Sequence, residues 1–205
     1  MAASGVGSAF PKVSGLEYVQ GEARVEELLG KAPLCVESWA TWCGPCRTSI
    51  AHLSELAAKY PEVAVVGVSA EPPSKIKPFV AKMGSQMSYT VASDSDREVE
   101  AAQAGLGMRG IPFATVIDAA GNVVYTGHPM EPAFESALAE QANTARQAAV
   151  KAARVDAVRG KSADELASCS VKELKGALAA LGADYSSCIE KRELVDLLAS
   201  TLAKS

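Results

Sequence analysis

Apolar residues along the first two thirds of the chain follow strand and helix periods in turn. Residues 34–39 predict a buried strand, and apolar side chains then recur at helical spacing over residues 50–60. Residues 63–68 are a continuous apolar run rich in β-branched side chains, which is typical of a strand buried on both faces of a parallel sheet. The opening segment is therefore predicted to be a βαβ unit.

The alternation continues to about residue 130. We predict helices over residues 74–83 and 96–104, and strands over residues 89–92, 115–118 and 123–126. The last two strands are close enough in sequence to form a hairpin. Strands that alternate with helices and end in a hairpin predict an α/β fold, with a mixed sheet flanked by helices on both faces.

After residue 130 the pattern becomes wholly helical. Residues 131–158 are rich in Ala and predict one long helix that ends at Gly160. A Ser followed three residues later by Glu, the pattern of a capping box, then occurs three times and marks helix starts. The boxes pair Ser162 with Glu165, Ser170 with Glu173 and Ser187 with Glu190, and the two larger helices are expected over residues 171–181 and 188–203.

These patterns divide the chain into three parts. Residues 1–135 are expected to form the α/β domain, residues 136–160 a linker helix, and residues 161–205 a small all-α domain. The composition, 48% hydrophobic and 21% charged over 205 residues, excludes global disorder. Twenty Lys and Arg against 24 Asp and Glu give a net charge of -4, which disfavours a general nucleic-acid binder.

The N-terminus shows no export signal. Met1–Pro11 has neither a basic start nor a continuous apolar stretch, and nowhere do 18 apolar residues run together. We therefore expect a cytoplasmic protein that makes no membrane span.

The spacing of two cysteines indicates the chemistry. Two of the five cysteines form Cys43-Gly44-Pro45-Cys46, between a predicted strand and a predicted helix. Unpaired N–H groups at a helix start favour a thiolate at Cys43, which can attack a disulfide. Cys46, one helical turn further on, can then resolve the mixed disulfide. The motif therefore predicts redox chemistry, with Cys43 as nucleophile and Cys46 as resolving thiol.

Metal binding is the chief alternative for such a pair. A structural zinc site needs four ligands, and the chain has no second pair of Cys or His at compatible spacing. We expect no metal and no cofactor. Cys169 and Cys188 are either packed thiols or a second redox pair, because the sequence does not fix the distance between them.

The cysteine motif also carries a family resemblance. Residues 39–47, Trp-Ala-Thr-Trp-Cys-Gly-Pro-Cys-Arg, resemble the active-site segment of thioredoxin-fold disulfide oxidoreductases. Residues 65–71 and 107–118 are similar to the TlpA/ResA branch, and the likeness extends over residues 10–140. The resemblance implies a thioredoxin-like fold and an enzyme that acts on protein disulfides, favouring their reduction, with an electron donor that regenerates the dithiol.

The resemblance further assigns residues around the cysteines. It implies that the peptide bond before Pro112 is cis, and that Ile111 and Pro112 present a backbone edge to the substrate beside the cysteines. Trp42, Gly44 and Pro45 complete the expected substrate-binding surface, with Trp42 as an exposed platform.

Glu37 is the acidic residue within the strand predicted over residues 34–39. Its position matches the buried acid of thioredoxins, so the resemblance implies a proton relay to or from Cys46 through water, with a pKa raised by burial. The alternative is an edge or half-exposed strand position with an ordinary carboxylate. The lysine that often partners this acid in the family has no counterpart over residues 63–68.

The C-terminal part carries a second resemblance. Residues 170–195 resemble the SAP-like fold found at the C-terminus of MANF/ARMET-type proteins. SAP modules bind DNA through basic helices, whereas residues 131–205 of this chain carry 10 basic against 11 acidic side chains. This balance favours docking of a protein partner over nucleic acid.

Three functional hypotheses follow. The leading one is a protein-disulfide reductase whose C-terminal module selects its partner. The second is an adaptor that holds protein clients and turns over disulfides only incidentally. A peroxidase comes third, because Ala40 stands where that chemistry has its usual Thr.

Overall fold

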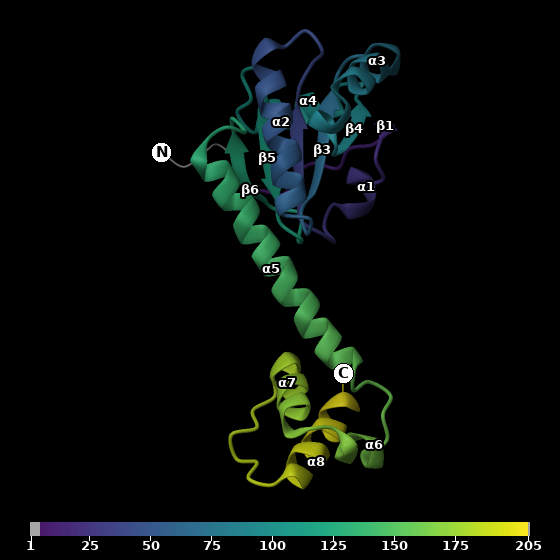
Figure 1. Cartoon of the computed structure of the whole chain (residues 1–205). Helices are drawn as coiled ribbons and strands as arrows, with labels where there is room; N and C mark the ends of the chain where they lie inside the picture. Colours follow the sequence, from purple (N-terminus) through teal and green to yellow (C-terminus); the bar gives the residue numbers. More distant parts are fainter. Residues whose placement is uncertain (1–4, 205) are drawn as a thin grey trace. The chain divides into compact units, whose positions relative to one another are not determined.

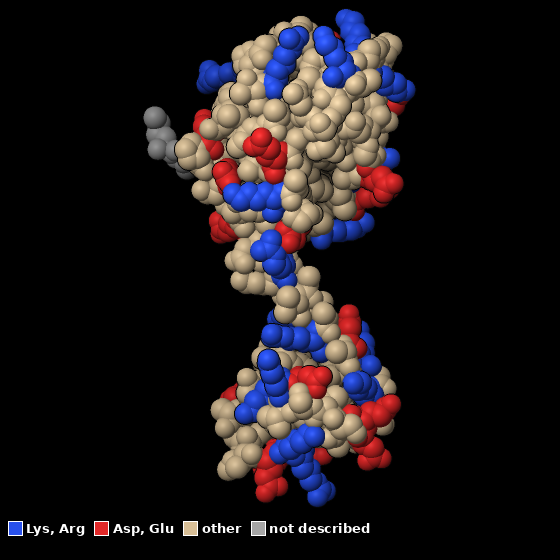
Figure 2. All heavy atoms as spheres, viewed as in Figure 1, with Lys and Arg blue, Asp and Glu red and all other residues tan. Residues whose placement is uncertain are grey.

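The computed structural model describes residues 5–204 and divides the chain into two compact units between Ala145 and Arg146. The first four residues of the segment searched for an export signal lie outside the described residues. The division falls inside one continuous helix, α5 (Pro132–Asp156). Figure 1 shows the elements of both units, and Figure 2 shows charged side chains on the surface of each.

The N-terminal unit is built on one six-stranded mixed sheet, with strand order β1-β4-β3-β2-β5-β6. The central strand β2 pairs in parallel with β3 and antiparallel with β5, and the last two strands form the predicted hairpin. The predicted mixed sheet and its βαβ opening are confirmed. The strands are β1 (Glu17–Gln20), β2 (Leu34–Ser38), β3 (Ala64–Ser69), β4 (Thr90–Ser93), β5 (Phe113–Ile117) and β6 (Val123–Gly127).

Helices cover both faces of this sheet. On one face, α2, α3 and the first part of α5 bury apolar side chains, among them Ile50, Ile76 and Phe134. On the other face, α1, α4 and the segment before β1 enclose a second core. The helices of this unit are α1 (Val25–Leu28), α2 (Gly44–Lys59), α3 (Pro73–Met83) and α4 (Glu98–Gly105), with a 3-10 turn η1 (Gly84–Met87) after α3.

Three short elements of the N-terminal unit, β1, α1 and the 3-10 turn η1, were not predicted. The strand β1 and the helix α1 have four residues each, which is too short for a hydrophobic period to register. β1 lies at the edge of the sheet and pairs only with β4. β2, unlike β1, lies in the interior of the sheet, which has a core on each face. The side chains of β2 therefore alternate between the two cores.

This alternation sets the direction of the side chains that matter for chemistry. Cys35 of β2 and Trp39, which directly follows the strand, lie in the core under α2. Leu34 and Val36 of β2 lie in the opposite core. Glu37 shares the face of Cys35, because successive side chains of a strand point to opposite faces. The acid therefore lies beneath the helix that carries the two active-site cysteines.

The C-terminal unit has a core of its own. The end of α5 packs through Val158 and its neighbours on α6 (Ala163–Ser168), α7 (Val171–Leu181) and α8 (Lys191–Leu202). The capping boxes at Ser162 and Ser170 are both present, as predicted. Leu174, Leu178, Leu194 and Leu198 are buried in this core.

The third predicted capping box, at Ser187, is wrong. α8 begins at Lys191, and its box joins Glu190 to Glu193. The Glu193 carboxylate accepts the backbone N–H groups of Ile189 and Glu190 at 2.6 and 2.9 Å, which places the helix start three residues later. Cys188 therefore lies in the loop before α8 rather than at its start.

Over residues 5–204, no helix has both the length and the hydrophobicity needed to cross a membrane.

Candidate active site

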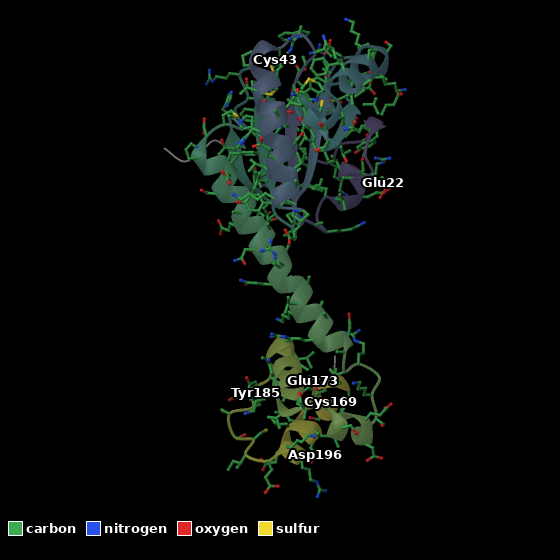
Figure 3. All side chains as sticks on the ribbon, viewed as in Figure 1. Glu22, Cys43, Cys169, Glu173, Tyr185 and Asp196 are labelled. Atoms are coloured by element: carbon green, nitrogen blue, oxygen red, sulfur yellow. A yellow bond between two sulfur atoms is a disulfide. The ribbon has the colours of Figure 1, made fainter. Side chains whose placement is uncertain are left out.

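Cys43 and Cys46 form a disulfide at the start of α2, where Figure 3 labels Cys43. Cys43 is the N-cap residue, and its Sγ accepts the backbone N–H of Cys46 at 3.2 Å. Pro45 lies in the first turn, where its missing N–H costs no helical hydrogen bond. The Cys-Gly-Pro-Cys spacing thus brings the two Cα atoms to 5.3 Å.

The start of α2 also supplies the electrostatic field. Its first turn contains no acidic side chain, so the positive end of the helix dipole faces Cys43 without a competing carboxylate. When the disulfide is reduced, this field favours the thiolate at Cys43. Cys46 is completely buried, so the pair presents Cys43 as the sulfur nearer the surface.

A second segment, far away in sequence, reaches the disulfide. The Ile111–Pro112 peptide bond is cis, as predicted, and the Ile111 carbonyl oxygen lies 3.8 Å from the Cys43 Sγ. Trp42, on the other side of Cys43, is 73% exposed, as expected of a platform, whereas Trp39 is buried. Gly44 and Pro45 are exposed at the same end of α2.

Glu37 is fully buried in the central strand. It lies opposite Gly67 of β3 and Ala114 of β5, so the alternative of an edge position is wrong. Burial raises the pKa of Glu37 from an ordinary value of 4.5 to about 8, and a hydrogen bond with Ser49 opposes this shift. The acid is therefore largely protonated at neutral pH in the oxidised protein.

Ser49 connects this acid to the cysteine helix, and sequence analysis missed it. Its hydroxyl donates to the Cys46 carbonyl oxygen at 3.0 Å and lies 3.4 Å from Glu37 Oε1. One hydroxyl has a single proton, so a protonated Glu37 can donate to Ser49 while Ser49 donates to Cys46. The signal was available, because Ser49 is one helical turn beyond Cys46 on the buried face of α2.

Other polar atoms around Glu37 lack protein partners. Among the described residues, Glu37 Oε2, the Trp39 Nε1–H and the Tyr89 hydroxyl are buried without a hydrogen bond to the protein. Gly67 lets the Tyr89 ring and the Trp39 indole pack closely against β3, since a Cβ there would stand 2.7 Å from the Tyr89 ring. Burial, and then the nearby Glu37, raise the pKa of the Cys35 thiol, which keeps it protonated.

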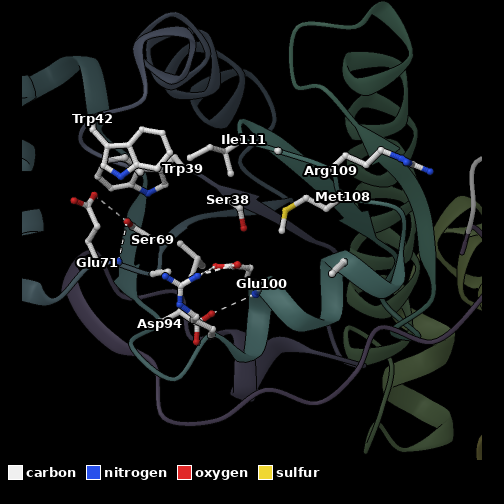
Figure 4. Close-up of a pocket in the computed structure, with 16 residues that line it drawn as sticks. Ser38, Trp39, Trp42, Ser69, Glu71, Asp94, Glu100, Met108, Arg109 and Ile111 are labelled. Atoms are coloured by element: carbon white, nitrogen blue, oxygen red, sulfur yellow. Dashed lines mark hydrogen bonds and ion pairs between the residues drawn. The ribbon is translucent and has the colours of Figure 1, made fainter.

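A cavity of about 420 Å³ opens beside the disulfide (Figure 4). Trp42 and Ile111 line it at the cysteine end, and Ser38 and Ser69 line it where β2 and β3 end. The carboxyl ends of parallel strands are where open α/β sheets bind ligands. The cavity is therefore positioned to receive a group attached to a disulfide that reaches Cys43.

Charged residues that sequence analysis did not select line this cavity. Glu71 accepts the backbone N–H and the hydroxyl of Thr41 at 2.7 and 2.8 Å, which fixes the loop before Trp42. Arg97 pairs with Glu100 at 2.7 Å and has a positive φ of 58°, a rare conformation for a side-chain-bearing residue. No local pattern predicts that these residues meet, because the order of the strands brings them together.

The remaining cysteines are not joined. Cys35, Cys169 and Cys188 are free thiols, which leaves the Cys43–Cys46 bond as the disulfide of the described residues. Within residues 5–204, no three His, Cys, Asp or Glu side chains are grouped as metal ligands would be.

Comparison with known proteins agrees with this site. Residues 6–126 match the AhpC/TSA family. The thiol-disulfide oxidoreductase ResA of Halalkalibacterium halodurans is 31% identical over 126 residues, which cover 58% of this chain and 68% of ResA. The thiol:disulfide interchange protein HelX of Rhodobacter capsulatus is 32% identical over 98 residues, which cover 46% of this chain and 51% of HelX.

Solved structures extend the comparison to the fold. A Chlorobium tepidum protein described as a thiol:disulfide interchange protein, DsbE, is 26% identical and covers 68% of this chain and 96% of its own, with a TM-score of 0.53. The thioredoxin domain of a Bacteroides vulgatus oxidoreductase covers 66% of this chain and 96% of its own with a TM-score of 0.54, but at 17% identity it supports the fold alone. The N-terminal unit has a thioredoxin-like fold, and the chain belongs to the AhpC/TSA family.

Proposed function

We propose that this protein is a thiol–disulfide oxidoreductase that reduces protein disulfides through a dithiol/disulfide cycle of Cys43 and Cys46. The observation that carries the proposal is the Cys43–Cys46 disulfide at a helix start, 3.8 Å from the Ile111 carbonyl oxygen. The ResA, HelX and DsbE relatives, named as oxidoreductases or interchange proteins, support it.

The cycle is balanced in sulfur and electrons. The Cys43 thiolate attacks one sulfur of the client disulfide, so a mixed disulfide forms and the other client sulfur leaves as a thiolate. Cys46 then attacks the Cys43 sulfur, which releases the second client thiol and leaves the Cys43–Cys46 disulfide. An external dithiol donor reduces that disulfide and becomes oxidised in turn.

Glu37 has the position of a proton relay in this cycle. Cys46 must lose its proton in order to attack, and Glu37 lies beneath α2 with Ser49 between it and the Cys46 backbone. With a pKa of about 8 it can both accept and return a proton near neutral pH. We assign it the transfer of the Cys46 proton through water, with Ser49 as a positioning residue.

Client binding is assigned to the exposed surface around Cys43. Trp42 offers an apolar platform, Gly44 and Pro45 leave the helix start uncovered, and the backbone edge at Ile111 and Pro112 faces the sulfur. The adjacent 420 Å³ cavity would take a side chain of the client next to its disulfide.

The experiment that tests the proposal is a turnover assay. The protein is supplied with dithiothreitol as donor and a disulfide-bonded protein such as insulin as substrate, and client thiols are counted over time. The oxidoreductase releases many client thiols per chain, above the rate with dithiothreitol alone. An adaptor with incidental redox chemistry binds the same clients without accelerating thiol release, and that result would overturn the proposal.

The C-terminal unit is assigned a docking role. We propose that it is a SAP-like helical module that selects the protein partner, a role supported by its separate core and by two confirmed capping boxes. Reduction of a small disulfide would then not require it. The cytoplasmic location stays a prediction.

A further inference from the structure

Two adjacent hollows mark the surface of the C-terminal unit. They have volumes of about 480 and 700 Å³ and share Arg154 of α5 and Ala179 of α7. Cys169, Glu173 and Tyr185, labelled in Figure 3, line the larger one. Together they form one groove between the second part of α5 and α7, which we call the basic groove.

The basic groove is lined by six cationic side chains and one carboxylate. The cations are Arg146, Lys151, Arg154, Lys161, Lys172 and Lys175. The carboxylate is Glu173, which already accepts the N–H and the hydroxyl of Ser170 at 2.7 Å each as part of the α7 cap. In Figure 2, blue side chains lie along this part of α5, and both blue and red side chains lie over the adjoining helices.

Most of this charge is not neutralised within the chain. Among residues 5–204, no carboxylate forms an ion pair with Lys151, Arg154 or Lys172. Lys161 Nζ lies 3.5 Å from the Cys169 sulfur, and Lys175 lies 6.0 Å from the Tyr185 ring centre. Cations that repel one another in a concave site gain free energy when an anionic group enters.

The two units also differ in charge, and this difference favours an anionic partner for the C-terminal unit. Residues 146–205 carry 10 basic and 8 acidic side chains, whereas residues 1–145 carry 10 basic and 16 acidic. Six of the 10 basic side chains in the C-terminal unit line the basic groove. Basic and acidic residues are therefore nearly equal in number in the sequence of this unit, but most of the basic side chains are concentrated in the basic groove.

The floor of the basic groove is apolar and shallow. Val150, Ala157 and Ala179 are exposed there, and Gly176 has no side chain, so the Arg154 side chain lies directly over it. Arg146 and Arg154 are eight residues apart on α5, a rise of about 12 Å, which matches about four residues of an extended peptide. Phosphate groups would use the cations but leave this apolar floor without contact.

We propose that the basic groove binds an extended acidic segment of a partner protein, in which carboxylates alternate with small apolar side chains. The cations pair with the carboxylates at the rim, and the apolar side chains lie on the floor of Ala and Val. This inference gives a surface and a partner chemistry to the proposed docking role of the C-terminal unit, and it rests on that role.

The test uses the full-length chain and a fluorescein-labelled 12-residue peptide in which Glu alternates with Ala and Val. Binding is measured by fluorescence anisotropy at low and high salt, with a 12-base-pair DNA duplex as the rival probe. The groove variant is Lys151→Glu with Lys172→Glu. The matched control is Arg192→Glu with Lys204→Glu, which changes the charge equally at exposed positions outside both hollows.

The groove variant should weaken binding of the acidic peptide at least about tenfold, and the control less than about twofold. The neutral variant Lys151→Gln with Lys172→Gln should fall between them, and salt should weaken binding to the parent chain. Circular dichroism checks that every variant is folded. No binding of the peptide, equal losses in groove variant and control, or tighter binding of the duplex would each overturn the proposal.

Insulin reduction measured on the same preparations separates this inference from the redox proposal. The groove variants should reduce insulin at the parent rate. A chain that binds the peptide but fails to turn over insulin would contradict the redox proposal and leave the groove assignment standing.

Discussion

The two units each place a cysteine at a helix end, Cys43 at the start of α2 and Cys169 at the end of α6, yet they do so with different results. Cys43 caps α2, and its partner lies one helical turn further on, so the two sulfurs are bonded. Cys169 lies directly before the Ser170 cap of α7, but Cys188 follows only after that whole helix, and both are free. A helix start can favour a thiolate, but only the one-turn spacing supplies a resolving partner.

The scaffold around each cysteine differs as well. In the N-terminal unit, the sheet brings the Ile111 carbonyl to one side of Cys43 and the buried Glu37 beneath the helix. In the C-terminal unit, Cys169 has Lys161 at 3.5 Å and no buried acid among its hydrogen-bond partners in the described residues. A sheet core holds a buried acid in place, which a small helical core of this kind does not provide.

The largest expected effect separates the two cysteine sites directly. Cys43→Ser should lower insulin turnover at least about a thousandfold, because it removes the attacking sulfur. The double variant Cys169→Ser with Cys188→Ser should retain the parent rate within about twofold, since neither sulfur is bonded in the chain. Comparable losses in both variants, measured by release of client thiols, would break the distinction between the units.

The next effect concerns the stability that the buried acid confers. Because the folded pKa of Glu37 is about 8 and its ordinary value is 4.5, the unfolded oxidised chain loses this proton first as pH rises. The contribution of Glu37 to the free energy of unfolding is therefore complete below about pH 4.5. It is lost as pH rises to about 8, which lowers the free energy of unfolding by a few kcal/mol.

Urea unfolding of the oxidised protein across this pH range measures the contribution. Glu37→Gln, which cannot ionise, should remove this part of the decline in unfolding free energy. Glu55→Gln, at an exposed position of the same region, should decline as the parent does. If the Glu37→Gln and parent curves run parallel, Glu37 is not a neutral buried acid.

A smaller effect is expected on the rates of the two chemical steps. Glu37→Ala should slow resolution by Cys46 about tenfold or more while changing the first attack by Cys43 much less, because the relay serves the buried thiol. Stopped-flow measurement of the formation and decay of a mixed disulfide with a chromogenic disulfide separates the steps. Equal slowing of both steps, or of neither, would remove the relay from the mechanism.

The smallest effect should come from removing the C-terminal unit. A chain that ends after Ala145 keeps the α5 residues that pack on the sheet, among them Phe134, Leu138 and Ala142. It should reduce a small chromogenic disulfide at a rate within about twofold of the full-length chain, but it should no longer bind the acidic peptide. Loss of small-disulfide reduction in a folded, truncated chain would show that the unit is part of the catalytic fold.

Much of the N-terminal unit could be predicted because its signals are local. The buried-strand pattern of β2, the continuous apolar run that includes β3 and the Cys-Gly-Pro-Cys spacing mark the strands and the reactive helix start. The cis bond before Pro112 came from the family resemblance instead, since a local pattern would indicate only a proline at a strand entry. The short elements β1 and α1 gave no period to detect.

The rest depends on contacts between distant segments. Glu71, Arg97 and Glu100 meet in one cavity because β3 lies between β2 and β4 in the sheet, an order that the sequence does not state. The start of α8 was misplaced because Ser187 and Glu190 offer the same local pattern as a real capping box. The basic groove does not show in the total charge of the unit, because six cationic side chains but only one carboxylate line it.

Trapping of the mixed disulfide tests the central claim most directly. Cys46→Ser keeps the sulfur of Cys43 but removes the thiol that would release the client, so disulfide-bearing clients should accumulate in a reducible covalent complex with the chain. Cys43→Ser should trap none. Mass spectrometry of the non-reduced complex should place the client on Cys43; linkage through Cys169 or Cys188 would contradict the account.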